Sequence, residues 1–172
     1  MVRQGWQRGG VALLCGLLAL TTLGIAAMPT EAASTLVVRR ADEQDVVLCR
    51  ADVAGQSFSL IFTHSMYGGQ VIERYVVNAD QTMSRTSITT DNAGAAEYYG
   101  SYGEVIREAG RYRLRVPPLQ LAELRFIADS TGDHRLRFGG RERRLAPAAG
   151  QAEHLVLRIE SLSPANEWRH RC

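Results

Sequence analysis

Short segments of alternating apolar and polar residues fill the chain from about Ser34 onward. Gly, Asn, Asp and Pro positions separate them, most clearly at 68–69, 91–94 and 130–133. Alternation with a period of two residues between such breaks predicts β-strands. The expected strands are 36–40, 46–53, 58–66, 71–79, 82–89, 104–108, 111–116, 121–128, 134–138 and 154–159.

This spacing of short strands predicts an all-β fold. We expect a single antiparallel β-sandwich or a partly open barrel of about 8–10 strands. In residues 111–116, arginines alternate with Tyr112, Leu114 and Val116, which is typical of a sheet with one face in water. A long helical period is absent, and only residues 119–124 are expected to form a helical turn. No linker interrupts residues 34–172, so we expect one domain.

Residues 1–33 have a different pattern. Arg3 and Arg8 precede an uncharged run over 11–28, with small residues around Ala32. This order is typical of a cleaved signal peptide. The run is also just long enough for an uncleaved N-terminal membrane anchor, because about 17 apolar residues span a bilayer. Under both interpretations we expect export to the periplasm or to the outer face of the cytoplasmic membrane, with membrane contact only through an uncleaved segment.

All 20 basic residues are arginines, and 18 acidic residues leave a net charge of +2. We expect no nucleic-acid partner, because the chain lacks the interleaved aromatic residues of such surfaces. From Ser101 onward, the chain has 13 arginines and nine acidic residues. This excess suits docking to an anionic membrane or an acidic protein, or it is simply a solvated sheet face.

Two cysteines remain if the signal segment is removed, Cys49 and Cys172. An oxidising compartment would allow them to pair. Closing so long a loop would stabilise the fold by about 4–5 kcal/mol through chain entropy. The alternative is a buried strand residue at Cys49 and a free thiol at Cys172.

A predicted hairpin over residues 57–75 is the most informative stretch. The two glycines at 68–69 suit the positive φ angles of a two-residue turn. With that turn, residues lie opposite one another in a fixed register along two strands. The expected pairs are Phe62 with Tyr75, Leu60 with Val77, and His64 with Glu73.

The expected His64–Glu73 pair would join an imidazole to a carboxylate at the end of an apolar stripe. Such a pair can orient a general base, bind a polar group of a ligand, or only satisfy itself at the edge of the core. Ser65 cannot be a nucleophile served by His64, because neighbouring strand residues point to opposite faces.

Other chemical motifs are missing. The chain has no Gly-x-Ser-x-Gly, His-Glu-x-x-His or Cys-x-x-Cys sequence. The remaining histidines lack the spacing of a zinc site, and residues 129–133 offer too few ligands for a calcium loop. The small residues of 91–100 suit either a loop that closes over a ligand or a plain connection. We expect no catalytic residues, no metal, no cofactor and no enzyme activity.

The segment Phe62-Thr63-His64-Ser65, with Glu73 nine residues after the histidine, resembles the signature of a bacterial domain-of-unknown-function family, number 1850. Ala93-Gly94-Ala95 resembles the small-residue loop of that family. The likeness extends loosely over residues 46–145. Members are small exported proteins, and their genes commonly neighbour those of TRAP-type tripartite uptake transporters.

The resemblance implies an accessory role in the envelope. Together with the export pattern, the β architecture and the missing catalytic motifs, it leads us to expect a non-enzymatic module that binds transporter subunits or a small-molecule ligand. The candidate functional polar site consists of His64, Ser65, Glu73 and Gly94. The alternatives are a small-molecule binding protein, or an enzyme with His64 as base and Glu73 as its orienting group.

This chain also departs from the family pattern. Asn92 replaces the first glycine of the small-residue loop, and Tyr67 and Gln70 stand where members often have Glu and Pro. A ligand site built from that loop and the extra Glu would therefore be altered or lost here.

Overall fold

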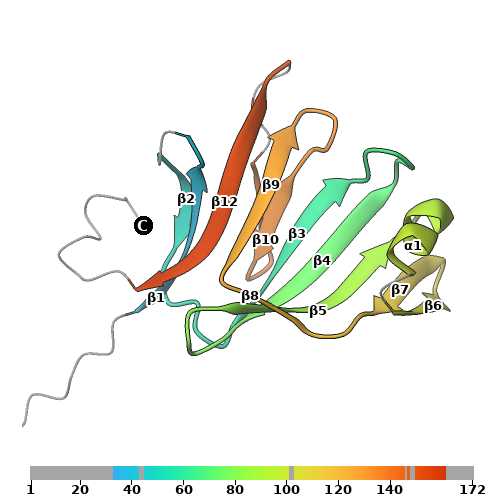
Figure 1. The fold of residues 1–172 in the computed structure, drawn as a ribbon, viewed down its shortest axis with the longest axis horizontal. Coiled ribbons are helices and arrows are strands. Elements are labelled where there is room, and N and C mark those ends of the chain that lie inside the picture. The colour runs from blue at the N-terminus through green and yellow to red at the C-terminus, as the bar shows by residue number, and fades with distance from the viewer. Residues whose placement is uncertain (1–32, 43–44, 101–102, 146, 148–149, 162–172) are drawn as a thin grey trace, which may run out of the picture. The chain divides into compact units, whose positions relative to one another are not determined.

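The computed structural model describes residues 33–42, 45–100, 103–145, 147 and 150–161. These residues form two antiparallel sheets in a sandwich-like arrangement, with one short helix (Figure 1). The elements are β1 (Ser34–Arg40), β2 (Val46–Arg50), β3 (Ser57–Thr63), β4 (Gln70–Val77), β5 (Met83–Thr90), α1 (Ala93–Gly100), β6 (Glu104–Glu108), β7 (Arg111–Arg115), β8 (Leu119–Leu121), β9 (Glu123–Asp129), β10 (Arg135–Phe138), β11 (Arg141–Arg144) and β12 (Ala152–Ser161).

The two sheets differ in size. The small sheet has the strand order β2-β1-β12-β9. The large sheet has the order β11-β10-β3-β4-β5-β7-β6, and β8 also pairs with β5. Only Ala122 separates β8 from β9, so the chain crosses from the large sheet to the small one at that residue.

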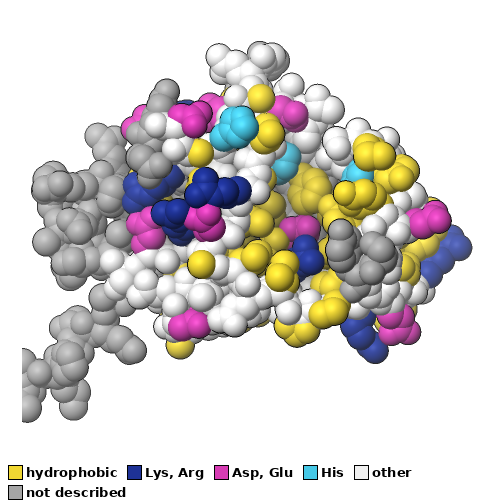
Figure 2. Space-filling view, viewed as in Figure 1, with side chains coloured by type: hydrophobic (Ala, Val, Ile, Leu, Met, Phe, Trp, Pro, Cys, Tyr) yellow, Lys and Arg dark blue, Asp and Glu magenta, His cyan; other side chains and the backbone are white. Residues whose placement is uncertain are grey.

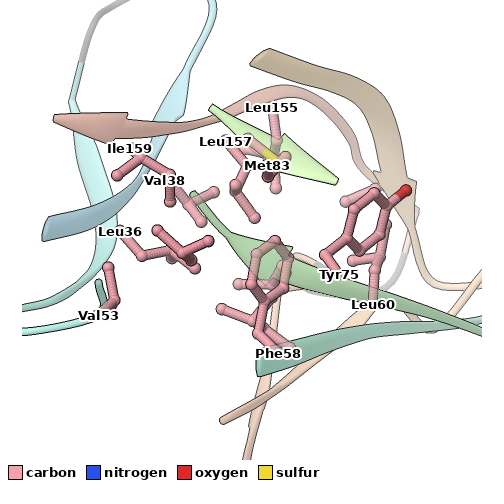
Figure 3. Close-up of a cluster of buried hydrophobic side chains, with 14 residues drawn as sticks. Leu36, Val38, Val53, Phe58, Leu60, Tyr75, Met83, Leu155, Leu157 and Ile159 are labelled. Carbon is pink, nitrogen blue, oxygen red and sulfur yellow. The ribbon is translucent and has the colours of Figure 1, made fainter. Parts of the chain in front are cut away.

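The main hydrophobic core lies between the two sheets (Figure 3). Leu36 and Val38 from β1 and Leu157 from β12 are fully buried in it. From the large sheet, Phe58 and Tyr75 form a cross-strand pair whose stacked rings have centroids 5.1 Å apart. Burying one such side chain is worth about 1.5–3 kcal/mol, so this cluster stabilises the sandwich.

Helix α1 covers a second part of the large sheet (Figure 1). It begins at Ala93 because Asn92 caps it: the Oδ1 atom of Asn92 accepts a hydrogen bond from the backbone N–H of Ala95 at 3.1 Å. A smaller core lies under the helix and contains Val71, Ile88, Ala95, Ala96, Leu114 and Val116. The inner face of the large sheet is therefore covered in one part by the small sheet and in another by α1.

Most of the predicted strands are confirmed, but residues 119–124 are not helical. Leu121 instead pairs with Met83 of β5, and β9 begins at Glu123. The one helix of the described residues is α1, within a segment expected to be a loop. Its Ala-Gly-Ala-Ala start has no apolar stripe at helical spacing, so the alternation pattern does not predict it. Strand β11 is also unpredicted, because its Arg-Glu-Arg-Arg sequence is exposed throughout.

The predicted signal or anchor segment lies outside the described residues. Among the described residues, no helix combines the length and the apolar character that a membrane span needs. Cys49 in β2 is disulfide-bonded. Cys172 lies outside the described residues, so its pairing with Cys49 stays a prediction.

Candidate functional site

The β3–β4 hairpin adopts a register different from the predicted one. Leu60, and not His64, lies opposite Glu73. The expected pairs Phe62–Tyr75, Leu60–Val77 and His64–Glu73 are therefore wrong, and each is displaced by four residues. A shift by an even number leaves every side chain on its expected face, because faces alternate with a period of two.

The cause of the shift is the loop between the two strands. Gly68 and Gly69 have the expected positive φ angles of 64° and 74°, but they belong to a six-residue connection over 64–69. The N–H of Gly68 donates to the carbonyl of His64 at 2.9 Å, and the N–H of His64 donates to the carbonyl of Gly69 at 3.0 Å. The imidazole supports this loop, since its Nδ1 accepts from the N–H groups of Met66 and Tyr67 at 3.3 and 3.4 Å.

His64 is buried in an aromatic cluster that it forms with Tyr67, Tyr98 and Tyr99. The centroid of its ring lies 5.1 Å from that of Tyr67, 5.2 Å from Tyr98 and 5.8 Å from Tyr99. Tyr67 belongs to the β3–β4 loop, and the other two tyrosines belong to α1. His64 thus joins the loop to the helix.

Gly94 and Asn92 complete this junction. A Cβ atom on Gly94 would lie 2.7 Å from the ring of Tyr67, so the helix and the loop can approach this closely only because the residue is glycine. The Nδ2 group of Asn92 donates to the carbonyl of Tyr67 at 2.9 Å. Ser65 is exposed on the loop. Of the predicted site residues, His64 and Gly94 therefore meet through Tyr67, whereas Glu73 lies elsewhere.

Glu73 lies on the inner face of the large sheet and is only 7% exposed. Its carboxylate accepts a hydrogen bond from the hydroxyl of Tyr75 at 2.5 Å and faces the Nη1 atom of Arg85 at 3.6 Å. Burial raises the pKa of Tyr75 above its ordinary value, and the adjacent carboxylate raises it further. The phenol therefore keeps its proton and remains a donor to Glu73.

Arg85 reaches this face because β5 contains a bulge. Tyr75 pairs with Arg85, but Arg74 pairs with Ser87, so Thr86 is an extra residue in β5. A bulge reverses which side chains point inward along the rest of the strand. In a regular strand, Arg85 and Ile88 could not both point toward the inner face, because they are three residues apart.

The sequence contained a signal for this bulge. Met83 and Ile88 are both buried on the inner face, although they are five residues apart in one strand. In a regular strand an odd spacing puts two residues on opposite faces. Two apolar residues at an odd spacing therefore indicate an irregularity between them.

A cleft of about 550 Å³ opens over Glu73, and we call it the Glu73 cleft. It lies between the inner face of the large sheet and the β8–β9 crossing. Figure 2 shows the molecule hollowed where hydrophobic side chains gather around acidic and basic ones. The lining residues are Leu60, Phe62, Leu119, Leu121, Leu124 and Phe126, with the polar Glu73, Tyr75, Arg85, Glu123, Arg125 and His134. His64 does not line this cleft.

His134 is a wall residue that sequence reasoning did not single out. Its ring stacks between those of Phe62 and Phe126, with centroids 5.3 Å away on each side. Burial lowers the pKa of His134, and this effect outweighs the opposite influence of Asp129 and Asp133. Spacing along the chain gave no signal for this arrangement, because it depends on the approach of β9 to β3.

Two buried nitrogen atoms at the cleft have no hydrogen-bond partner among the described residues. They are the Nε of Arg85 and the Nδ1 of His134. A buried donor without a partner costs about 1–3 kcal/mol. Among all the described residues, no group of three His, Cys, Asp or Glu side chains is placed to hold a metal ion.

Comparison with family models matches residues 58–145 to "Domain of unknown function (DUF1850)". The chain belongs to this family. The DUF1850 match covers β3 to β11, and so includes the hairpin, α1 and the strands that form the Glu73 cleft. Neither the curated proteins nor the solved structures gave a match to the chain. Membership in DUF1850 thus identifies the domain and leaves its function to be argued from the geometry.

Proposed function

We propose that this DUF1850 protein is a non-enzymatic binding module that holds a small organic molecule in the Glu73 cleft. The observation that carries the proposal is the cleft itself, with about 550 Å³ between apolar walls and a polar floor of Glu73, Tyr75 and Arg85. Ligand sites in proteins are typically clefts of roughly 300–1,000 Å³ with a few polar groups among apolar side chains.

The polar floor is not explained by stability. Taking a carboxylate and a guanidinium out of water costs several kcal/mol per ion, and the attraction between them offsets this only with good geometry. Here a single 3.6 Å approach joins Glu73 to Arg85. Apolar residues of similar volume would fill the same place without loss of folding stability. The presence of Glu73 and Arg85 there therefore supports a role in recognition.

The geometry also supports binding over catalysis. A general base needs a free nitrogen or oxygen within reach of the substrate. The Nδ1 of His64 accepts from two backbone N–H groups, and its ring is enclosed by three tyrosines. Glu73, which the enzyme hypothesis uses to orient His64, instead accepts a hydrogen bond from the hydroxyl of Tyr75.

A thermal-shift screen of small organic molecules tests the binding proposal. Leu124→Trp would fill the cleft from its wall. Ile127→Trp is the matched control, because Ile127 lies on the same strand, is half exposed and does not line the cleft. We expect compounds that raise the Tm of the wild type and of Ile127→Trp but not that of Leu124→Trp. Hits that stabilise all three proteins equally would contradict the proposal.

We also propose that the protein is exported and acts beside a TRAP-type transporter through protein contact. The N-terminal residue pattern and membership in DUF1850 support this. A specific observation favours contact at the β3–β4 loop and α1, where Met66, Tyr67 and Tyr98 are 71%, 44% and 49% exposed. Exposed large apolar side chains that gather in one place are typical of protein-binding surfaces.

Affinity purification from the native envelope tests the partner. We expect the wild type to recover transporter subunits, and Met66→Glu to recover fewer. Ile127→Glu is the control, because Ile127 is a half-exposed apolar residue on β9, outside the β3–β4 loop and α1. If transporter subunits are never recovered, the partner proposal fails while the cleft proposal stands.

A further inference from the structure

We infer that the ligand of the Glu73 cleft is an organic carboxylic acid, bound as its carboxylate by Arg85 with its hydrocarbon part against the apolar walls. The inference rests on the proposed binding function and adds the chemical class of the ligand. Three features of the cleft carry it: its acids already have donors, its central cation has a donor to spare, and its walls are apolar.

The acids of the cleft are already paired. Glu73 receives the hydroxyl of Tyr75 on Oε2 and faces Arg85 with Oε1. At the rim, Glu123 accepts hydrogen bonds from Arg125 and Arg158, which lower its pKa. A cationic ligand or a ligand rich in N–H donors would have to displace these partners.

The central cation, in contrast, has an unused donor. A guanidinium carries five N–H donors, and the closest approach of Arg85 to Glu73 is that of Nη1, at 3.6 Å. Its Nε is buried and has no partner in the described part of the chain. The Nε–H and one N–H of Nη2 lie along one edge of the guanidinium, and this edge matches the two oxygens of a carboxylate. Because Nε is covered by its neighbours, the guanidinium has to turn this edge toward the cleft when the ligand enters.

The walls define the rest of the ligand. Leucine and phenylalanine side chains form them: Leu60, Phe62, Leu119, Leu121, Leu124 and Phe126. A hydrocarbon body would lose its contact with water against them. The free edge of Arg85 offers two donors, which match the two oxygens of one carboxylate, whereas a phosphate dianion would need further donors. A monocarboxylate with an aryl or alkyl body therefore fits better than a phosphate or a sugar.

Calorimetry with three matched probes tests the chemical class. The probes are 4-phenylbutanoate, 4-phenylbutanamide and 4-phenylbutylamine, which differ only in the polar end. We expect the acid to bind the wild type at least about tenfold more tightly than the amide or the amine. In an NMR experiment that detects arginine side chains, the Nε–H resonance of Arg85 should shift on addition of the acid.

Arg85→Lys tests the assigned residue. A lysine keeps the positive charge beside Glu73 but has no edge that can hold both oxygens of a carboxylate. We expect it to bind 4-phenylbutanoate at least about tenfold more weakly. Arg137→Lys is the control outside the cleft, where the side chain is 44% exposed, and we expect less than about a threefold change. The NMR shift needs no variant, so it stays informative if Arg85→Lys does not fold.

The possible failures are distinguishable. If the amide or the amine binds as tightly as the acid, and Leu124→Trp abolishes that binding, the carboxylate inference is wrong and the binding function stands. The same conclusion follows if Arg85→Lys binds the acid like the wild type. If no probe binds and the screen gives no compound that depends on Leu124, both the inference and the proposed function are wrong.

Discussion

The hydroxyl of Tyr75 donates a hydrogen bond to the carboxylate of Glu73 at 2.5 Å, two residues away on the same face of β4. The ring of Tyr75 stacks on Phe58 in the main core, and Figure 3 shows its oxygen at the edge of that cluster. Glu73 is thus tied to the main core. His64 is instead tied to α1 through its tyrosine neighbours. The two residues expected to form one site belong to separate parts of the domain.

Tyr75→Phe should destabilise the protein, because it leaves a buried oxygen of Glu73 without its donor. We expect the free energy of unfolding to fall by about 1–3 kcal/mol, measured by urea denaturation. Tyr112→Phe is the control, since the hydroxyl of Tyr112 makes no hydrogen bond among the described residues. We expect it to change stability by less than about 0.5 kcal/mol. Equal effects of the two substitutions would mean that the Tyr75–Glu73 hydrogen bond does not stabilise the fold.

Period-two alternation predicted the strands well, because a sheet that is buried on one face needs apolar residues at every second position. The strand over 104–108 has the expected bounds, and 111–116 differs from β7 by one residue. The order of strands in each sheet and the crossing at Ala122 depend on contacts between distant segments. Local alternation carries no information on those contacts.

The candidate site was predicted less well, for two physical reasons. The faces of the hairpin residues were correct, but the register was not, because the imidazole of His64 accepts backbone N–H groups and widens the turn. The second reason is that the floor of the cleft depends on Arg85, which the bulge at Thr86 directs inward. The sequence showed that residues 64 and 73 are polar positions in an apolar hairpin. It could not show their partners, because those lie on segments that only the tertiary structure brings together.

Gly94→Ala should destabilise the protein even though it lies in a helix. In an ordinary helix interior this change stabilises by roughly 0.5–1 kcal/mol. Here the new Cβ would lie 2.7 Å from the ring of Tyr67, so we expect a net loss of about 1–3 kcal/mol. Gly100→Ala at the other end of α1 is the control, because its Cβ would meet only a methyl group of Val105, at 3.1 Å. Urea denaturation of both variants measures the two losses. A Gly94→Ala protein as stable as Gly100→Ala would show that α1 and the β3–β4 loop are not tightly packed at Tyr67.

Stability should fall as the pH is lowered through the titration of His134. Burial lowers the pKa of this side chain in the folded protein, whereas the unfolded chain takes up a proton near the ordinary value of 6.5. Below that pH the unfolded state binds more protons, so the free energy of unfolding decreases toward acid and is greatest above about pH 7. Hydrogen bonds from arginines lower the pKa values of Glu123 and Glu142, so these carboxylates titrate below this window.

His134→Phe checks this assignment, because a phenyl ring keeps the stack between the two neighbouring phenylalanines. Urea denaturation between pH 5 and 7 should give a flatter pH profile for this variant than for the wild type. His154→Gln, at an exposed position of β12, should keep the wild-type slope. A slope that persists in His134→Phe would assign the pH dependence to another group.

The side chain of Asn92 makes two separate contacts. Its Oδ1 caps α1, and its Nδ2 binds the carbonyl of Tyr67. Asn92→Ser keeps a capping oxygen and loses only the second contact, so we expect a loss of about 0.5–1.5 kcal/mol. Asn92→Ala loses both, and its unfolding free energy should fall by roughly a further 1 kcal/mol. Urea denaturation of both variants, with amide exchange at Ala95 as the readout of the cap, separates the two contacts. If Ser and Ala are equally destabilising, the cap contributes nothing, and the side chain acts only by holding the β3–β4 loop against the helix.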